Sequence, residues 1–134
     1  MYDYEAKLIK VVDGDTIDVH IDLGFSVWTT KRLRFARIDA YESRTRDLEE
    51  KKLGLAAKQL VIDELENADK ILIRVTEKGK FGRWIAEINI INNDKIEKTE
   101  INNYMDALKA IDQSFGTNLN DLLVEKKLAI YKEY

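Results

Sequence analysis

Five charged residues in this sequence have the types and the spacing that phosphate chemistry needs: Asp15, Arg34, Asp39, Glu42 and Arg83. Carboxylate oxygens are the ligands that a hard cation such as Ca²⁺ prefers, and a further carboxylate can orient or deprotonate a water molecule. A guanidinium group matches two phosphate oxygens with its planar fork of donors. Together these side chains suffice for metal-assisted hydrolysis of a phosphodiester.

The five residues lie in three short motifs, each of which also has an ordinary structural explanation. The motifs are Asp13-Gly14-Asp15-Thr16, Arg34-Phe35-Ala36-Arg37-Ile38-Asp39-Ala40-Tyr41-Glu42 and Lys80-Phe81-Gly82-Arg83. An Asp-Gly-Asp sequence is often only a turn between strands, and an arginine that follows a glycine is often solvated. Arg34 and Arg37 are an odd number of positions apart on a predicted strand, so they should face opposite sides, and one of them can be a surface arginine.

Length and composition predict one domain over residues 1–134. The absence of cysteine excludes disulfides, zinc-thiolate sites and cysteine nucleophiles. The net charge of -3 argues against a protein that coats nucleic acid nonspecifically, but not against an enzyme with a local basic groove. We find no apolar run long enough for a bilayer and no signal peptide. We therefore expect no membrane partner, a monomer, and a cytoplasmic location unless a leader was removed.

Hydrophobic periodicity predicts an α+β fold that is mainly β. Strands are expected at 7–12, 17–22, 27–38, 71–75 and 84–91, a helix at 53–65, and a flexible loop over the polar run 43–52. Thr99 is a candidate cap for a second helix that stops at Gly116, and Asn118 for a third. This order predicts a five-stranded barrel with about three attached helices.

Four segments, in this order, resemble the staphylococcal-type thermonuclease family between about residues 7 and 129. They are LIKVVDGDT, RFARIDAYE, GKFGRW and LNDLLVEKKLA. The resemblance implies a calcium-dependent nuclease on an OB-fold barrel, with DNA and/or RNA as its substrate. It also implies a helical insertion at about 92–118, and the family's usual C-terminal helix is missing.

The resemblance assigns roles to the metal-site residues. It makes Asp15 and Asp39 the carboxylate ligands of Ca²⁺, gives a backbone carbonyl ligand to Ala40, and places Asp13 behind them as support. Glu42 would orient or deprotonate the attacking water.

The same resemblance assigns the substrate contacts. Arg34 and Arg83 would clamp the scissile phosphate and stabilise its transition state. Further candidates for substrate binding are Lys80, Phe81, Tyr131 and Tyr134.

Two positions depart from the family pattern. Tyr41 stands where the family prefers proline, which predicts a looser turn before Glu42. Lys127 stands in place of a glycine at a helix C-terminus, where left-handed backbone geometry favours glycine.

The alternative function is a non-catalytic OB-fold module that binds nucleic acid or a protein. Degenerate copies of this kind typically lose carboxylates or arginines, and the retention of all five charged residues favours the enzyme.

Overall fold

The computed structural model describes residues 3–43, 45–78, 84–92 and 116–132. The strands are β1 (Asp3–Asp13), β2 (Thr16–Asp22), β3 (Trp28–Phe35), β4 (Ile38–Ala40), β5 (Lys70–Lys78), β6 (Trp84–Ile91), β7 (Gly116–Asn118) and β8 (Ala129–Tyr131). The described helices are α1 (Leu48–Glu66) and α4 (Leu119–Glu125). The helix expected between Thr99 and Gly116 lies outside the described residues, and Gly116 itself opens β7.

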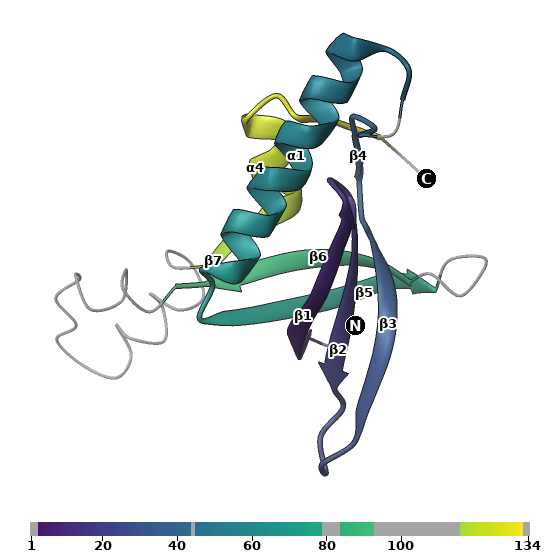
Figure 1. Cartoon of the computed structure of the whole chain (residues 1–134). Coiled ribbons are helices and arrows are strands. Elements are labelled where there is room, and N and C mark those ends of the chain that lie inside the picture. Colours follow the sequence, from purple (N-terminus) through teal and green to yellow (C-terminus); the bar gives the residue numbers. More distant parts are fainter. Residues whose placement is uncertain (1–2, 44, 79–83, 93–115, 133–134) are drawn as a thin grey trace, which may run out of the picture.

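Five strands close into a barrel. Antiparallel neighbours run in the order β3-β2-β1-β5-β6, and a parallel pairing of Leu33–Phe35 with Trp84–Ala86 joins β3 to β6. Strand β7 extends β6 at Asn89–Ile91, while β4 and β8 form a separate two-stranded sheet. The predicted α+β barrel is confirmed (Figure 1).

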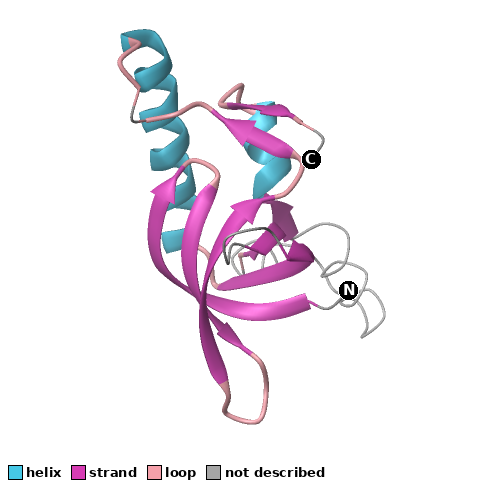
Figure 2. Cartoon of the chain, turned by 90° about the vertical axis from the view of Figure 1, so that its right-hand side faces the viewer, coloured by secondary structure: helices cyan, strands magenta, loops and turns pink. Residues whose placement is uncertain are grey.

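The barrel interior is filled by alternate residues of the strands. On β2, Ile17, Val19 and Ile21 are fully buried while the residues between them are half-exposed, as a strand with one core-facing side requires. Helix α1 covers the barrel with the side chains of Ala57, Val61 and Leu65. In two perpendicular views the helices and the β4–β8 sheet gather toward one end of the molecule, and the β2–β3 hairpin extends toward the other (Figure 1 and Figure 2).

The prediction of one continuous strand over 27–38 is wrong. Strand β3 ends at Phe35, a turn follows, and β4 joins a different sheet. Arg37 in that turn has a φ of 65°, in the left-handed region that non-glycine residues seldom adopt. The turn contains no glycine or proline that would predict it from the sequence, and it is held by a hydrogen bond from Asn120 to the carbonyl of Ala36.

The polar run 43–52 is not wholly a loop, because α1 already begins at Leu48. Asp47 caps the helix, since its side chain accepts hydrogen bonds from the backbone N–H groups of Glu49 and Glu50. The first turn is mostly exposed, so it needs no apolar stripe, and periodicity alone misses it.

The C-terminal part agrees with expectation at its helix and differs after it. Asn118 caps α4 by accepting from the N–H of Asp121, and Lys127 has a φ of 61°, the left-handed geometry predicted there. Strand β8 was not predicted, and it places Tyr131 opposite Ile38. Neither described helix has a stretch of the length and apolarity that crossing a membrane requires.

Candidate active site

The turn between β1 and β2 carries the first motif and packs directly on α1. Asp13 accepts a hydrogen bond from the N–H of Gly14 at 2.9 Å, which tightens the turn. A Cβ added at Gly14 would lie 2.7 Å from the Cβ of Ala57. Glycine is therefore required by the close approach of the helix, and the helix in turn fixes the neighbouring Asp15.

Arg34 joins the first motif to the second. It lies opposite Thr16 in the β2–β3 register, which directs its side chain toward the turn. Its Nη1 is 2.8 Å from Asp15 Oδ2 and its Nη2 is 3.2 Å from Asp39 Oδ1. Two carboxylates that are distant in sequence thus converge on one guanidinium, whose side chain is only 16% exposed.

Asp15 is the buried member of this cluster, with 8% exposure. Its Oδ2 accepts from the N–H of Ala40 at 3.0 Å, and its Oδ1 accepts from the hydroxyl of Thr16 at 3.1 Å. Burial raises the pKa of the Asp15 carboxyl, and the positive charge of Arg34 opposes that rise. The ionised form of Asp15 is therefore poorly solvated, and the positive charge of Arg34 stabilises it.

Asp39 and its neighbours form the open side of the cluster. The Asp39 side chain is 41% exposed, and its Oδ2 lies 3.6 Å from Lys132 Nζ. Antiparallel pairing of β4 with β8 brings Asp39 opposite Ile130 and so places Tyr131 and Lys132 beside the cluster.

Glu42 follows the cluster on a loop that is tied down at both sides of it. The N–H of Tyr41 donates to the carbonyl of Leu128 at 3.3 Å, and the buried Ser43 donates its hydroxyl to Asp13 at 3.1 Å. The Glu42 carboxylate is exposed and makes no hydrogen bond or ion pair with the other described residues. These ties hold the segment that contains Tyr41.

The structure therefore brings together Asp13, Asp15, Arg34, Asp39 and Ala40, with Glu42 on an adjoining loop. Of the other predicted site residues, Tyr131 is on β8 beside the cluster, and Lys80, Phe81, Arg83 and Tyr134 lie outside the described residues. Whether the third motif joins the cluster stays a prediction.

The donors of this cluster suit a hard cation. Two carboxylates and a neighbouring backbone carbonyl are all oxygen ligands, and the convergence of Asp15 and Asp39 on Arg34 places both carboxylates within reach of one centre. Within the described ranges, however, no group of three or more acidic, histidine or cysteine side chains gathers in metal-binding geometry. Among the described residues the donor set is therefore these two carboxylates and the neighbouring carbonyl, without a third acidic, histidine or cysteine ligand.

An open pocket of about 640 Å³ adjoins the cluster. Its lining includes Ala36, Arg37, Ile85, Glu87, Tyr131 and Lys132. Lys132 belongs to both, since it lines the pocket and pairs with Asp39. The pocket lining thus combines the ring of Tyr131 and the cationic Arg37 and Lys132 with the acidic Glu77 and Glu87.

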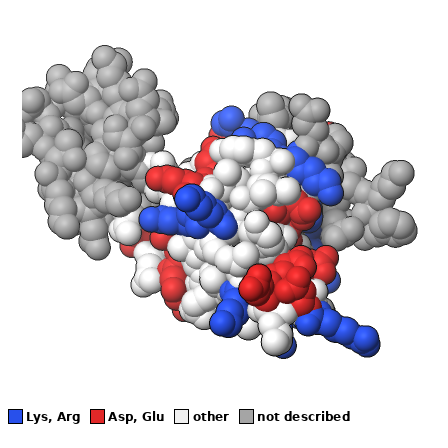
Figure 3. All heavy atoms as spheres, turned by 90° about the horizontal axis from the view of Figure 1, so that it is seen from above, with Lys and Arg blue, Asp and Glu red and all other residues white. Residues whose placement is uncertain are grey.

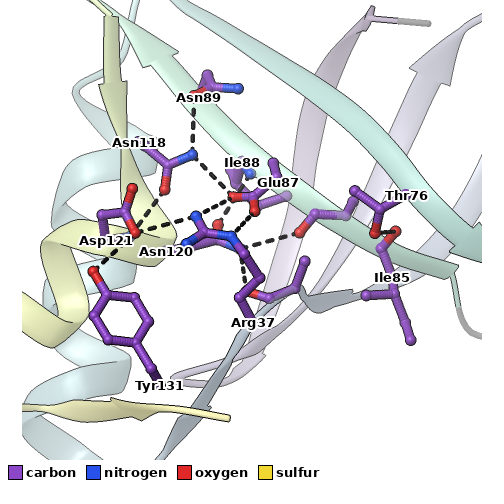
Figure 4. A network of polar contacts seen from close by, with 12 residues as sticks. Arg37, Thr76, Ile85, Glu87, Ile88, Asn89, Asn118, Asn120, Asp121 and Tyr131 are labelled. Atoms are coloured by element: carbon purple, nitrogen blue, oxygen red, sulfur yellow. Dashed lines mark hydrogen bonds and ion pairs between the residues drawn. The ribbon is translucent and has the colours of Figure 1, made fainter. Parts of the chain in front are cut away.

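A second arginine-centred network, which sequence reasoning missed, forms a wall of this pocket (Figure 4). Arg37 donates to both carboxylate oxygens of Glu87 and lies 3.1 Å from Asp121, which also accepts from the hydroxyl of Tyr131. The hydrogen bond with Glu87 raises the pKa of Arg37, and the one with Asp121 raises the pKa of Tyr131. The Arg37 network joins the β3–β4 turn to β6 and α4.

Asn120 was also missed, although it stands in the late-helix segment that carries the family resemblance. It is fully buried, accepts from the N–H of Ile88, and donates to the carbonyls of Ala36 and Ala86. A buried asparagine in a short apolar helix was the available signal, because such a group must be hydrogen-bonded. Asn120 fixes the turn between Arg34 and Asp39.

Charge near the site is mixed. Seen from above, this end of the molecule shows Lys and Arg side chains interspersed with Asp and Glu, without one continuous basic surface (Figure 3). This agrees with the net charge of -3.

Comparisons with known proteins leave the function open. No family model matches the chain. The chain is similar to a protein of Methanocaldococcus jannaschii described as "Uncharacterized protein MJ1439", with 28% identity over 112 aligned residues that cover 69% of this chain and 52% of that protein. The chain thus spans about half the length of this relative, whose description names no activity.

Proposed function

We propose that the protein is a calcium-dependent nuclease that hydrolyses phosphodiester bonds of DNA and/or RNA. The observation that carries the proposal is the placement of one half-buried guanidinium, that of Arg34, between the carboxylates of Asp15 and Asp39. A fold seldom buries charge in this way for stability alone, because desolvation offsets much of the attraction. The resemblance to thermonucleases supports the same assignment.

Asp15 and Asp39, with the Ala40 carbonyl, would hold the calcium ion. When bound, the ion supplies positive charge that offsets the negative charge of the phosphodiester. Arg34 would then turn its two donors from the aspartates to the phosphate oxygens, where its fork matches the developing charge. Arg83 would supply a second fork.

Glu42 would act on the water. An exposed carboxylate that pairs with no other described residue is suited to accept a proton or to orient the nucleophile. The loop contacts of Tyr41 and Ser43 hold it near the aspartates without occupying it. Tyr131 and Lys132, on the pocket wall, would contact the substrate beyond the scissile phosphate.

The test is digestion of single- and double-stranded DNA and of RNA, with Ca²⁺, with Mg²⁺ and with a calcium chelator. We expect cleavage in Ca²⁺, none in chelator, and poor cleavage in Mg²⁺, which demands tighter octahedral geometry. Full activity in chelator would contradict the metal assignment. Binding of nucleic acid without cleavage in any metal would instead assign the non-catalytic module.

A variant pair separates Glu42 from general effects of charge. Glu42→Gln should abolish most turnover while calcium affinity is retained, because the aspartates hold the ion. Glu66→Gln is the matched control, since Glu66 is exposed at the C-terminal end of α1, roughly 18 Å along the helix from Gly54, on which the Glu42 backbone lies. Equal turnover in the two variants would remove Glu42 from the mechanism.

A further inference from the structure

The loop that carries Glu42 lies directly on α1 at Gly54. A Cβ added at Gly54 would lie 2.3 Å from the carbonyl carbon and oxygen of Glu42, and 2.5 Å from the backbone nitrogen of Ser43. Real Cβ atoms essentially never approach within 3.0 Å of other heavy atoms, and the atoms met here belong to the backbone. Gly54 has an ordinary helical φ, so glycine is required here by space and not by conformation.

Both partners of this contact are fixed by other contacts. The loop is tied by Tyr41 to Leu128 and by Ser43 to Asp13. The helix is anchored because Ala57 and the buried residues after it belong to the barrel core. A methyl group at position 54 could be accommodated only by movement of one of them, and the short loop has fewer anchors than the helix.

The same face of α1 also contacts the first motif. Gly14, which precedes Asp15, packs on Ala57, and Ala57 is three residues after Gly54 on the helix. Residues three apart lie on one helical face. Helix α1 thus contacts the turn that carries Asp15 and the peptide that carries Glu42, one above the other.

We propose that Gly54 is a positioning residue for Glu42. By seating the peptide between Glu42 and Ser43 on α1, it sets the placement of the Glu42 carboxylate relative to Asp15 and Asp39. The catalytic consequence rests on the proposed nuclease function, whereas the seating of the loop does not.

The first experiment uses the unaltered protein and asks whether the loop sits on α1 in solution. In an NMR spectrum, we expect a nuclear Overhauser contact between the Gly54 α-protons and the Ser43 amide proton. The Ser43 amide should also exchange with solvent slowly, as a packed group does. Absence of that contact together with rapid exchange overturns the proposal, whatever any variant does.

The second experiment uses Gly54→Ala. Alanine favours the helix itself, so harm to the protein must come from the contact with the loop. We expect faster amide exchange over residues 41–43 and a loss of turnover of roughly 100-fold, the scale of a displacement of about 1 Å. Calcium affinity should change little, and the loss should fall on kcat and not on KM.

The matched control is Ala56→Gly, which weakens the same helix at an exposed position without touching the loop. Loop exchange and turnover should stay near the unaltered values. If Gly54→Ala loses no more turnover than this control, the positioning role is wrong while the nuclease proposal stands. If the unaltered protein cleaves nothing, the nuclease proposal fails, and the difference in loop exchange between the two variants decides the role of Gly54.

Discussion

Arg34 and Arg37 stand three residues apart, and each bridges two carboxylates, but in different surroundings. Arg34 is 16% exposed and holds Asp15 and Asp39 at the barrel end, where burial opposes the ionisation of Asp15. Arg37 is 48% exposed and holds Glu87 and Asp121.

The difference teaches where to seek function and where to seek structure. Burying a charge costs free energy that an ion pair only partly returns, so a buried carboxylate–arginine cluster beside a pocket suggests chemistry. A network centred on a half-exposed arginine gains less from each ion pair, even though the Glu87 side chain is only 14% exposed, and it can orient a pocket wall and join elements. The Arg34 cluster is of the first kind and the Arg37 network of the second.

The sharpest way to break this comparison is to change both arginines to lysine. Lysine keeps the charge but lacks the planar fork. Arg34→Lys should lower kcat at least roughly 100-fold, the effect of removing one preorganised donor. Arg37→Lys should act mainly on KM, because its guanidinium lines the pocket and is held by acids. Steady-state kinetics on one nucleic-acid substrate gives kcat and KM for both variants. Equal losses of kcat would contradict the different roles of Arg34 and Arg37.

The next largest effect concerns the free energy of unfolding that the β3–β4 turn contributes, because Asn120 holds this turn. Asn120→Ala should lower the free energy of unfolding by about 3 kcal/mol, because it leaves buried backbone groups of Ile88, Ala36 and Ala86 with fewer partners. Asn118→Ala removes a helix cap and should cost about 1 kcal/mol. Chemical denaturation of both variants checks the order, and a cost for Asn120→Ala no larger than that for Asn118→Ala would contradict it.

The two clusters also separate what the sequence can predict from what it cannot. The residues of the Arg34 cluster lie within short motifs, so the sequence could name them as candidates, although their roles came from the family resemblance and not from spacing alone. The sequence predicts only that one of Arg34 and Arg37 can be a surface arginine, and it gives no sign of the contact between Arg37 and Glu87, which are 50 positions apart. Barrel strands followed from apolar alternation, since core burial imposes it.

Features set by tertiary contacts were not predictable from local patterns. The turn that ends β3 after Phe35 contains no glycine or proline. It is held instead by the buried side chain of Asn120 on α4, which donates to the carbonyl of Ala36. The start of α1 depends on a cap at Asp47 and an exposed first turn. Neither leaves the periodic apolar trace on which a sequence argument relies.

A smaller effect on stability should come from the different backbone conformations of Arg34 and Arg37. At position 37, where φ is 65°, glycine should be more stable than alanine by about 1 kcal/mol, because left-handed geometry strains any Cβ. At position 34, inside β3, the order should reverse by a similar amount. Melting temperatures of the four variants test this, and alanine being the better residue at both positions would place Arg37 in ordinary strand geometry.

The smallest effect is electrostatic, and it tests whether Arg34 acts on the buried acid. In chelator, the pKa of Asp15 should lie above 3.8, because burial disfavours its charged form. The folded state then binds this proton more tightly than the unfolded state. Asp15 therefore favours folding fully below pH 3.8, and that contribution is lost as pH rises through its folded pKa. Arg34→Met should raise this pKa further by removing the opposing charge, whereas Arg37→Met should leave it unchanged. Added Ca²⁺ should lower the pKa of Asp15, since cation and proton compete for the carboxylate.

An NMR titration of the Asp15 carboxyl carbon measures this pKa in the unaltered protein with chelator, in the unaltered protein with Ca²⁺, and in the two arginine variants. A pKa that responds equally to both arginine variants would show that the two clusters are one electrostatic unit.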